Sequence, residues 1–155
     1  MRNFTQALNA ANEAGDRTQL AEALKGIGQI ERDLGNFESA LQHYREAVSV
    51  ERSLNNSLAL AHTIRHVADI LRQRGELLSA RSSYEEALSL YRNHHQAPAL
   101  DLANTLRGFA LLKSDMGETQ PAKLLWQEAK NLYKEVNVQA GVEESDRQLV
   151  LLSNE

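Results

Sequence analysis

GNFESALQHYREA, at residues 35–47, sets a pattern that returns twice further along this chain. Counted from Gly35, an apolar residue stands at offset +2, alanine at +5, an aromatic residue at +9, glutamate at +11 and alanine at +12. The same series starts again at Gly75 and at Gly117, where Thr119 at offset +2 is a weaker match. Agreement at these positions in three copies indicates an internal repeat.

The residues before each of the three glycines repeat as well. An alanine stands at offset −14, an aliphatic residue at −11 and a small residue at −7. Offsets −11, −8, −7 and −4 follow one face of a helix, and offsets +2, +5, +9 and +12 follow one face of a second helix. The glycine between them can take the left-handed conformation that ends a helix. Each copy is therefore predicted to be a helical hairpin.

The first copy resembles the signature of the tetratricopeptide repeats. The residues that carry the resemblance are Ile27, Gly28, Gly35, Phe37, Ala40, Tyr44 and Ala47, and the other copies match in part. The resemblance covers nearly the whole chain and implies an all-α fold, a right-handed α-solenoid of antiparallel helical hairpins with about eight helices. The unit of the family has about 34 residues, whereas Gly35 to Gly75 is 40 residues (75 − 35) and Gly75 to Gly117 is 42 (117 − 75). Such long spacing is similar to that of kinesin light chain-like repeats, and bacterial repeat proteins share it.

A single domain is expected over residues 1–155, because this length suits one core. Residues 1–14 fit the second half of a repeat, and three full repeats are predicted at 17–56, 57–97 and 98–137. A last helix at 138–153, with a polar outer side, is predicted to cap the array. The half-repeat at the start either caps the other end or shows that the sequence is a fragment of a larger regulatory protein, and both interpretations stay open.

Composition argues against several classes of function. The chain has no cysteine, so it has no disulfide, thiolate metal site or cysteine nucleophile. No apolar run approaches the roughly 20 residues that span a bilayer, and residues 1–6 lack a signal-peptide core; no membrane association and a cytoplasmic location are expected. The net charge of −4 argues against general nucleic-acid binding.

No arrangement of nucleophile, base and acid can be assembled from the sequence, so the protein is predicted to be non-catalytic and to need no cofactor. The repeated glutamates at offset +11 could suggest acid–base chemistry. They flank the packing alanine, however, and are predicted to stabilise the hairpins instead. These residues are Glu46, Glu86 and Glu128.

The family resemblance implies that the first helix of each hairpin lines the concave side of the solenoid, where a ligand would sit. Two columns on these helices are basic although the protein is acidic overall: offset −10 and offset −3. The candidate peptide-binding residues are Lys25, Gln29, Arg32, His62, Arg65, Asp69, Arg72, Asn104, Arg107 and Leu111.

The functional hypothesis is a protein–protein interaction module that binds an extended or helical segment of a partner protein in this groove. Acidic groups on the partner would suit the arginines, because guanidinium forks match carboxylates. A second interpretation is that Arg65 and Arg72 pair with Asp69 on their own helix, at i,i+4 and i,i+3 spacing. Self-association, giving a homo-oligomer or a structural scaffold, is the alternative function, suggested by the apolar run at residues 149–152.

The spacing of three residues on one helix also permits a metal site. His62, His66 and Asp69 share one helical face, and two imidazoles with a carboxylate could hold zinc or nickel. No glutamate stands between the histidines as a hydrolytic HExxH motif requires. Ordinary polar lining of the groove is the competing interpretation, and no metal is expected.

Overall fold

The structure is a computed structural model that describes residues 2–154. Over these residues the chain forms eight α-helices and no strand. The helices are α1 (Arg2–Ala14), α2 (Arg17–Asp33), α3 (Phe37–Ser53), α4 (Ser57–Gln73), α5 (Leu77–Arg92), α6 (Ala99–Asp115), α7 (Thr119–Glu135) and α8 (Gln139–Ser153). Within residues 2–154, no helix combines the length and the apolar character needed to cross a membrane.

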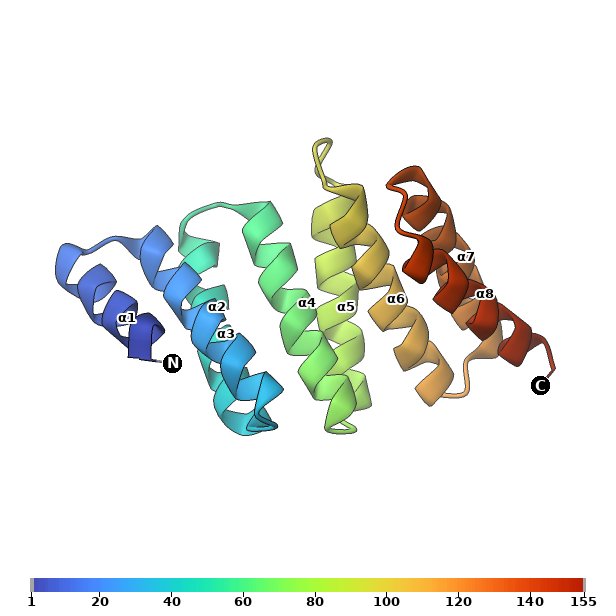
Figure 1. The fold of residues 1–155 in the computed structure, drawn as a ribbon, viewed down its shortest axis with the longest axis horizontal. Helices are drawn as coiled ribbons and strands as arrows, with labels where there is room; N and C mark the ends of the chain where they lie inside the picture. The colour runs from blue at the N-terminus through green and yellow to red at the C-terminus, as the bar shows by residue number, and fades with distance from the viewer. Residues whose placement is uncertain (1, 155) are drawn as a thin grey trace.

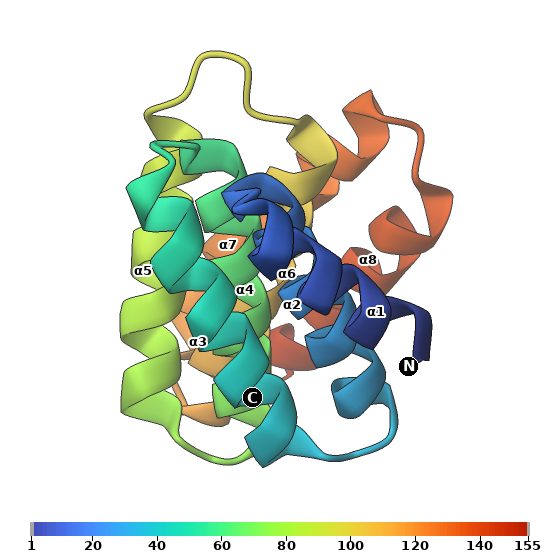
Figure 2. The same cartoon turned by 90° about the vertical axis from the view of Figure 1, so that its left-hand side faces the viewer.

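The helices pack as sequential antiparallel pairs. Helix α2 packs on α3, α4 on α5 and α6 on α7, and α8 packs on α7. Figure 1 shows the pairs standing side by side along one axis, with the two termini at opposite ends of the row. Seen from the side in Figure 2, the second helices α3 and α5 lie in one layer, and α2 and α6 lie in another. The all-α fold of stacked hairpins predicted from the sequence is confirmed.

Residues in the left-handed region end the first helix of each hairpin. Gly35, Gly75 and Gly117 have φ of 81°, 78° and 73°, as the sequence predicts for the turn glycines. Asparagine takes the same role after α3 and after α7, where Asn55 and Asn137 have φ of 53° and 57°. Asparagine is one of the few residues with a side chain that enters this region readily.

The two helices of a hairpin touch through small residues. The alanines at offsets +5 and +12 are completely buried in all three copies. A methyl group placed at Gly28 would lie 3.0 Å from the ring of Tyr44, so the glycine lets this aromatic side chain lie directly against α2. Tyr44 and its counterparts, Tyr84 and Trp126, are 0–1% exposed. The aromatic residue at +9 therefore fills the centre of each unit.

Two of the glutamates at offset +11 connect neighbouring hairpins rather than the helices of one hairpin. Glu86 pairs with Arg52 of the preceding repeat at 2.6 Å, and Glu128 pairs with Arg92 at 2.8 Å. In both pairs the arginine stands at offset +17 of one repeat and the glutamate at +11 of the next. The sequence predicts that these glutamates stabilise the hairpins, whereas the structure shows two of them in ion pairs between neighbouring hairpins.

Candidate functional site

An open groove runs across the face formed by α2, α4 and α6. It encloses a cavity of about 480 Å³. Six of the candidate residues line it: Arg32, Arg65, Asp69, Arg72, Arg107 and Leu111. Four residues that were not on the list of candidates line the same cavity: Asp33, Phe37, Gln73 and Gly108. Side chains from three different repeats thus meet in one place.

Two further cavities of about 280 Å³ each hold the remaining candidates. Lys25, Gln29 and His62 line the first of them together with His66. Asn104 lines the second, beside Tyr133 and Glu144. This second cavity shares three lining residues with the large groove: Arg65, Asp69 and Arg107. That any of these residues contacts a ligand remains a prediction.

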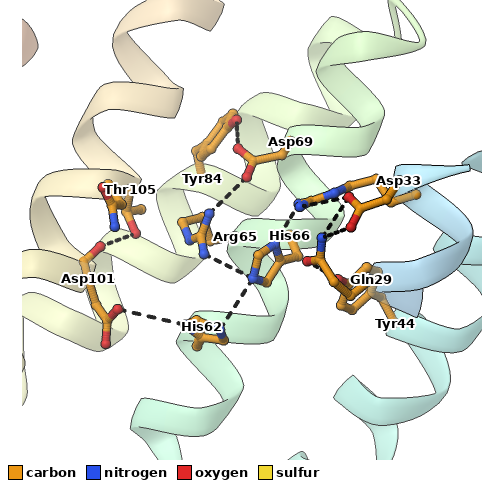
Figure 3. A network of polar contacts seen from close by, with 12 residues as sticks. Gln29, Asp33, Tyr44, His62, Arg65, His66, Asp69, Tyr84, Asp101 and Thr105 are labelled. Carbon is orange, nitrogen blue, oxygen red and sulfur yellow. Dashed lines mark hydrogen bonds and ion pairs between the residues drawn. The ribbon is translucent and has the colours of Figure 1, made fainter. Parts of the chain in front are cut away.

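A polar network centred on His66 joins α2 to α4 (Figure 3). Its Nδ1 atom lies 3.0 Å from Nη1 of Arg32, and its Nε2 atom lies 2.9 Å from Nη2 of Arg65. The Nε2 atom of His62 lies 3.2 Å from the same Nε2 of His66. The imidazole of His66 stacks on the ring of Tyr44, with centroids 5.2 Å apart. His66 is therefore held from four sides.

This environment keeps the histidines neutral. Burial, followed by the charge of Arg65, lowers the pKa of His66 to about 2. His62 and Arg32 act in the same direction on that pKa. Burial is also the largest cause that lowers the pKa of His62, although the carboxylate of Asp101 opposes the change. An uncharged imidazole has one nitrogen that accepts a hydrogen bond and one that donates.

Most of the basic candidates already have an acidic partner inside the protein. Arg107 makes a bidentate pair with Glu144, with Nε and Nη2 at 2.6 and 2.7 Å from the two carboxylate oxygens. Lys25 lies 2.6 Å from Glu22 and 3.2 Å from the buried Glu51. A ligand that carries carboxylates must therefore compete with these internal pairs.

The ion pairs predicted between residues of α4 are found in part. Arg65 bonds Asp69 through Nη1 at 3.0 Å, four residues along the same helix. Arg72 does not use Asp69; it donates to Asp115 of α6 at 2.9 Å. Asp69 instead accepts a second hydrogen bond from the hydroxyl of Tyr84 on α5.

Tyrosine hydroxyls from the second helices hold three of the candidate residues in place. Tyr44 donates to Gln29 at 3.3 Å, Tyr84 donates to Asp69, and Tyr133 donates to Asn104 at 2.8 Å. These tyrosines were not among the candidates from the sequence.

A signal for the first two tyrosine bonds was nevertheless present in the sequence. The first two copies carry tyrosine at offset +9 and a polar residue at −6, fifteen residues earlier. The third copy carries Trp126 and Leu111 at these two offsets. Both members of the polar pair are thus replaced together by apolar residues, and the two apolar residues pack in one cluster.

The geometry does not assemble the metal site that the spacing left open. In the part of the chain that the structure describes, no group of three histidine or acidic side chains is placed to hold a metal ion. The carboxylate of Asp69 is turned to Arg65 and Tyr84, away from the pair formed by His62 and His66.

Comparison with known proteins agrees with the fold of stacked helical hairpins. Two models of the tetratricopeptide repeat match residues 2–53 and 60–97, together more than half of the chain. Among solved structures, the crystal structure of BtubC (BKLC) from P. vanneervenii matches with a TM-score of 0.69 and 14% sequence identity, over 99% of this chain and 76% of that one. At this identity the likeness concerns the fold alone. No match was found among curated protein sequences. The chain belongs to the tetratricopeptide-repeat family.

Proposed function

We propose that this protein is a non-catalytic interaction module that binds an acidic segment of a partner protein in the groove along α2, α4 and α6. Tetratricopeptide repeats generally serve as protein–protein interaction modules, so a protein partner follows from the family. The observation that carries the proposal is that four arginines from three repeats line one open cavity. These are Arg32, Arg65, Arg72 and Arg107.

The spacing of the arginines fits a polypeptide better than a small molecule. Three successive first helices each contribute arginine, and an extended chain advances about 3.3 Å per residue. Basic side chains on these helices would therefore meet separate residues of one extended ligand. Phe37 and Leu111 line the same cavity and offer apolar contact between the charges.

The charge of the groove favours acidic ligands. The four arginines face two carboxylates within the lining of the cavity, those of Asp33 and Asp69. Guanidinium–carboxylate hydrogen bonds are stronger than neutral ones and are geometrically selective. An acidic side chain of the partner that replaces an internal partner keeps the guanidinium satisfied, whereas an apolar one leaves it without an acceptor.

Arg72→Gln, with Arg92→Gln as its matched control, tests the proposal. Each substitution leaves one carboxylate of similar exposure unpaired, Asp115 at 42% or Glu128 at 43%, but only Arg72 lines the groove. Peptides selected from a random displayed library on the immobilised wild-type protein would then be titrated against both variants. We expect Arg72→Gln to weaken the selected peptides about tenfold or more, which corresponds to about 1.4 kcal/mol or more. Equal affinities of the two variants would contradict the groove as the binding surface.

Self-association is the second candidate function. In the run at residues 149–152, Leu152 is 5% exposed and Leu149 packs beside it in the cluster around Trp126, whereas Val150 and Leu151 are 62% and 59% exposed on α8. Adjacent exposed apolar side chains favour contact with another surface. Light scattering at several concentrations tests this candidate. A dimer that dissociates on Leu151→Asp supports it, and a monomer at every concentration argues against it.

A further inference from the structure

Two arginines at the same repeat position differ in how their side chains are satisfied. Arg65 and Arg107 both stand at offset −10. Arg107 presents the edge made by Nε and Nη2 to Glu144, which accepts both hydrogen bonds. The same edge of Arg65 faces no carboxylate: its Nη2 lies 2.9 Å from Nε2 of His66, and its buried Nε has no hydrogen-bond partner. The Nε/Nη2 edge of Arg107 is therefore satisfied by a carboxylate, and the same edge of Arg65 is not.

His66 cannot satisfy both arginines that face it. A guanidinium only donates hydrogen bonds, and a neutral imidazole accepts at a single nitrogen. Arg32 faces Nδ1 of His66, and Arg65 faces Nε2. When Nδ1 accepts from Arg32, Nε2 carries the hydrogen, which suits the neighbouring His62 but opposes Arg65. In the other tautomer, Arg32 faces the N–H instead. Either way one guanidinium N–H finds no acceptor on His66. Arg32 also has Asp33 at 3.7 Å, whereas the buried Nε of Arg65 has no hydrogen-bond partner, which is costly for a buried group.

We propose that Arg65, with Arg32 beside it, forms a carboxylate-binding subsite, in which an aspartate or glutamate side chain of the bound partner takes the place of His66 at the Nε/Nη2 edge of Arg65. The subsite rests on the proposed function, because it assigns one contact within the same groove. Both arginines line that groove, so an acidic side chain entering it reaches their guanidinium groups. It contacts the buried Nε of Arg65 once His66 moves aside. His66 is a positioning residue, which holds the two guanidinium groups apart until the carboxylate arrives.

The opposite edge of Arg65 is fixed independently of the ligand. Its Nη1 donates to Asp69, and Asp69 is in turn held by the hydroxyl of Tyr84. Tyr84 is completely buried, so this chain of contacts anchors the guanidinium to the core. A carboxylate at the free edge would complete the arrangement that Arg107 already has with Glu144, without disturbing Asp69.

The test uses hexaglutamate with an amidated C-terminus, so that only side-chain carboxylates are present. We expect the Nε–H resonance of Arg65 to move on titration, and Arg65→Gln to weaken binding at least tenfold. Arg65→Lys keeps the charge toward Asp69 but removes the fork, so it should also weaken binding while it preserves the fold. Arg52→Gln is the matched control, because Arg52 pairs with Glu86 and does not line the groove.

Each contrary result has a distinct meaning. Hexaglutamate that binds equally to Arg65→Lys and Arg52→Gln overturns the subsite. If the resonances of Arg72 and Arg107 still move, the groove remains the binding surface and only the assignment to Arg65 is wrong. Hexa-alanine with a free C-terminus is the second probe, and binding as tight as that of hexaglutamate would overturn the assignment to an acidic side chain. Absence of any hexaglutamate binding also overturns the subsite, whereas the peptides selected for the Arg72 experiment test the groove separately.

Discussion

Tyr84 donates its hydroxyl hydrogen to the carboxylate of Asp69 across the α4–α5 hairpin. The tyrosine is completely buried, and burial together with the charge of Asp69 raises the pKa of its phenol well above the ordinary value. The hydroxyl therefore stays protonated and remains a donor. The contact fixes Asp69, which in turn fixes one edge of Arg65 in the groove.

Removing the hydroxyl of Tyr84 should lower the free energy of unfolding more than removing the corresponding hydroxyl in the preceding repeat. Tyr84→Phe takes a hydrogen bond from a charged acceptor, and we expect the free energy of unfolding to fall by about 1.5–3 kcal/mol. Tyr44→Phe is the matched control, because Tyr44 donates to the neutral amide of Gln29 at 3.3 Å. Its loss should be about 0.5–1.5 kcal/mol. Urea unfolding of both variants measures the difference, and equal losses would show that the charge of Asp69 does not strengthen the bond.

Acid should destabilise the protein through His66. The unfolded imidazole has a pKa near 6.5, whereas the folded one has a pKa of about 2. Below about pH 6.5 the unfolded state binds a proton that the native state does not, so stability is present above this pH and is lost as the pH falls through it. The contribution approaches about 1.4 kcal/mol per pH unit below pH 6.

Urea unfolding at pH 7, 6 and 5 checks this dependence. In His66→Gln, the free energy of unfolding should fall less steeply as the pH decreases. Glutamine does not titrate, so the unfolded state of this variant binds one proton fewer. His95→Gln changes an exposed side chain in the connection between α5 and α6 and serves as the control. If the free energy of unfolding declines equally in both variants, groups other than His66 cause the acid destabilisation.

The turn glycines should resist substitution for conformational reasons alone. A methyl group at Gly75 would meet nothing within 4 Å, but the residue has φ of 78°. We expect Gly75→Ala to destabilise the protein by about 1–2 kcal/mol, because a side chain is disfavoured in this region. Asn55→Gly, at φ of 53°, should change stability by less than about 1 kcal/mol, because glycine adopts this conformation without steric cost. Thermal unfolding of the two variants compares them, and a neutral Gly75→Ala would refute the backbone explanation.

The two residues of each ion pair between repeats should be weakly coupled, and their coupling free energy should depend on the salt concentration. Arg92 and Glu128 are about half exposed and lie 2.8 Å apart. A double-mutant cycle with Arg92→Ala and Glu128→Ala should give a coupling free energy of about 0.2–1 kcal/mol. Adding 0.5 M sodium chloride shortens the screening length to about 4 Å. This addition should remove most of the coupling free energy. A coupling that persists in salt would indicate a contribution from packing rather than charge.

The hairpins were predictable because their causes are local. Helix period, turn glycines and the small and aromatic positions all act within about twenty residues of Gly35. The N-cap at Asp16 follows the same logic: its carboxylate accepts from the backbone of Gln19 at 3.0 Å, as the residue type predicts. Each of these features depends on neighbours along the chain, so the sequence alone determined the repeat and the all-α class.

The partner of each charged side chain was decided by the tertiary structure. Arg72 could have used Asp69, three residues away on its own helix, but it reaches Asp115 on α6. Arg107 takes Glu144 from α8, and His66 lies between guanidinium groups from two helices. These choices depend on distances between helices of different repeats, and those distances are set by how side chains of different size pack across the stack. Offsets within one helix carry no such information, so the sequence determined the hairpins, and their stacking determined which charges face the groove.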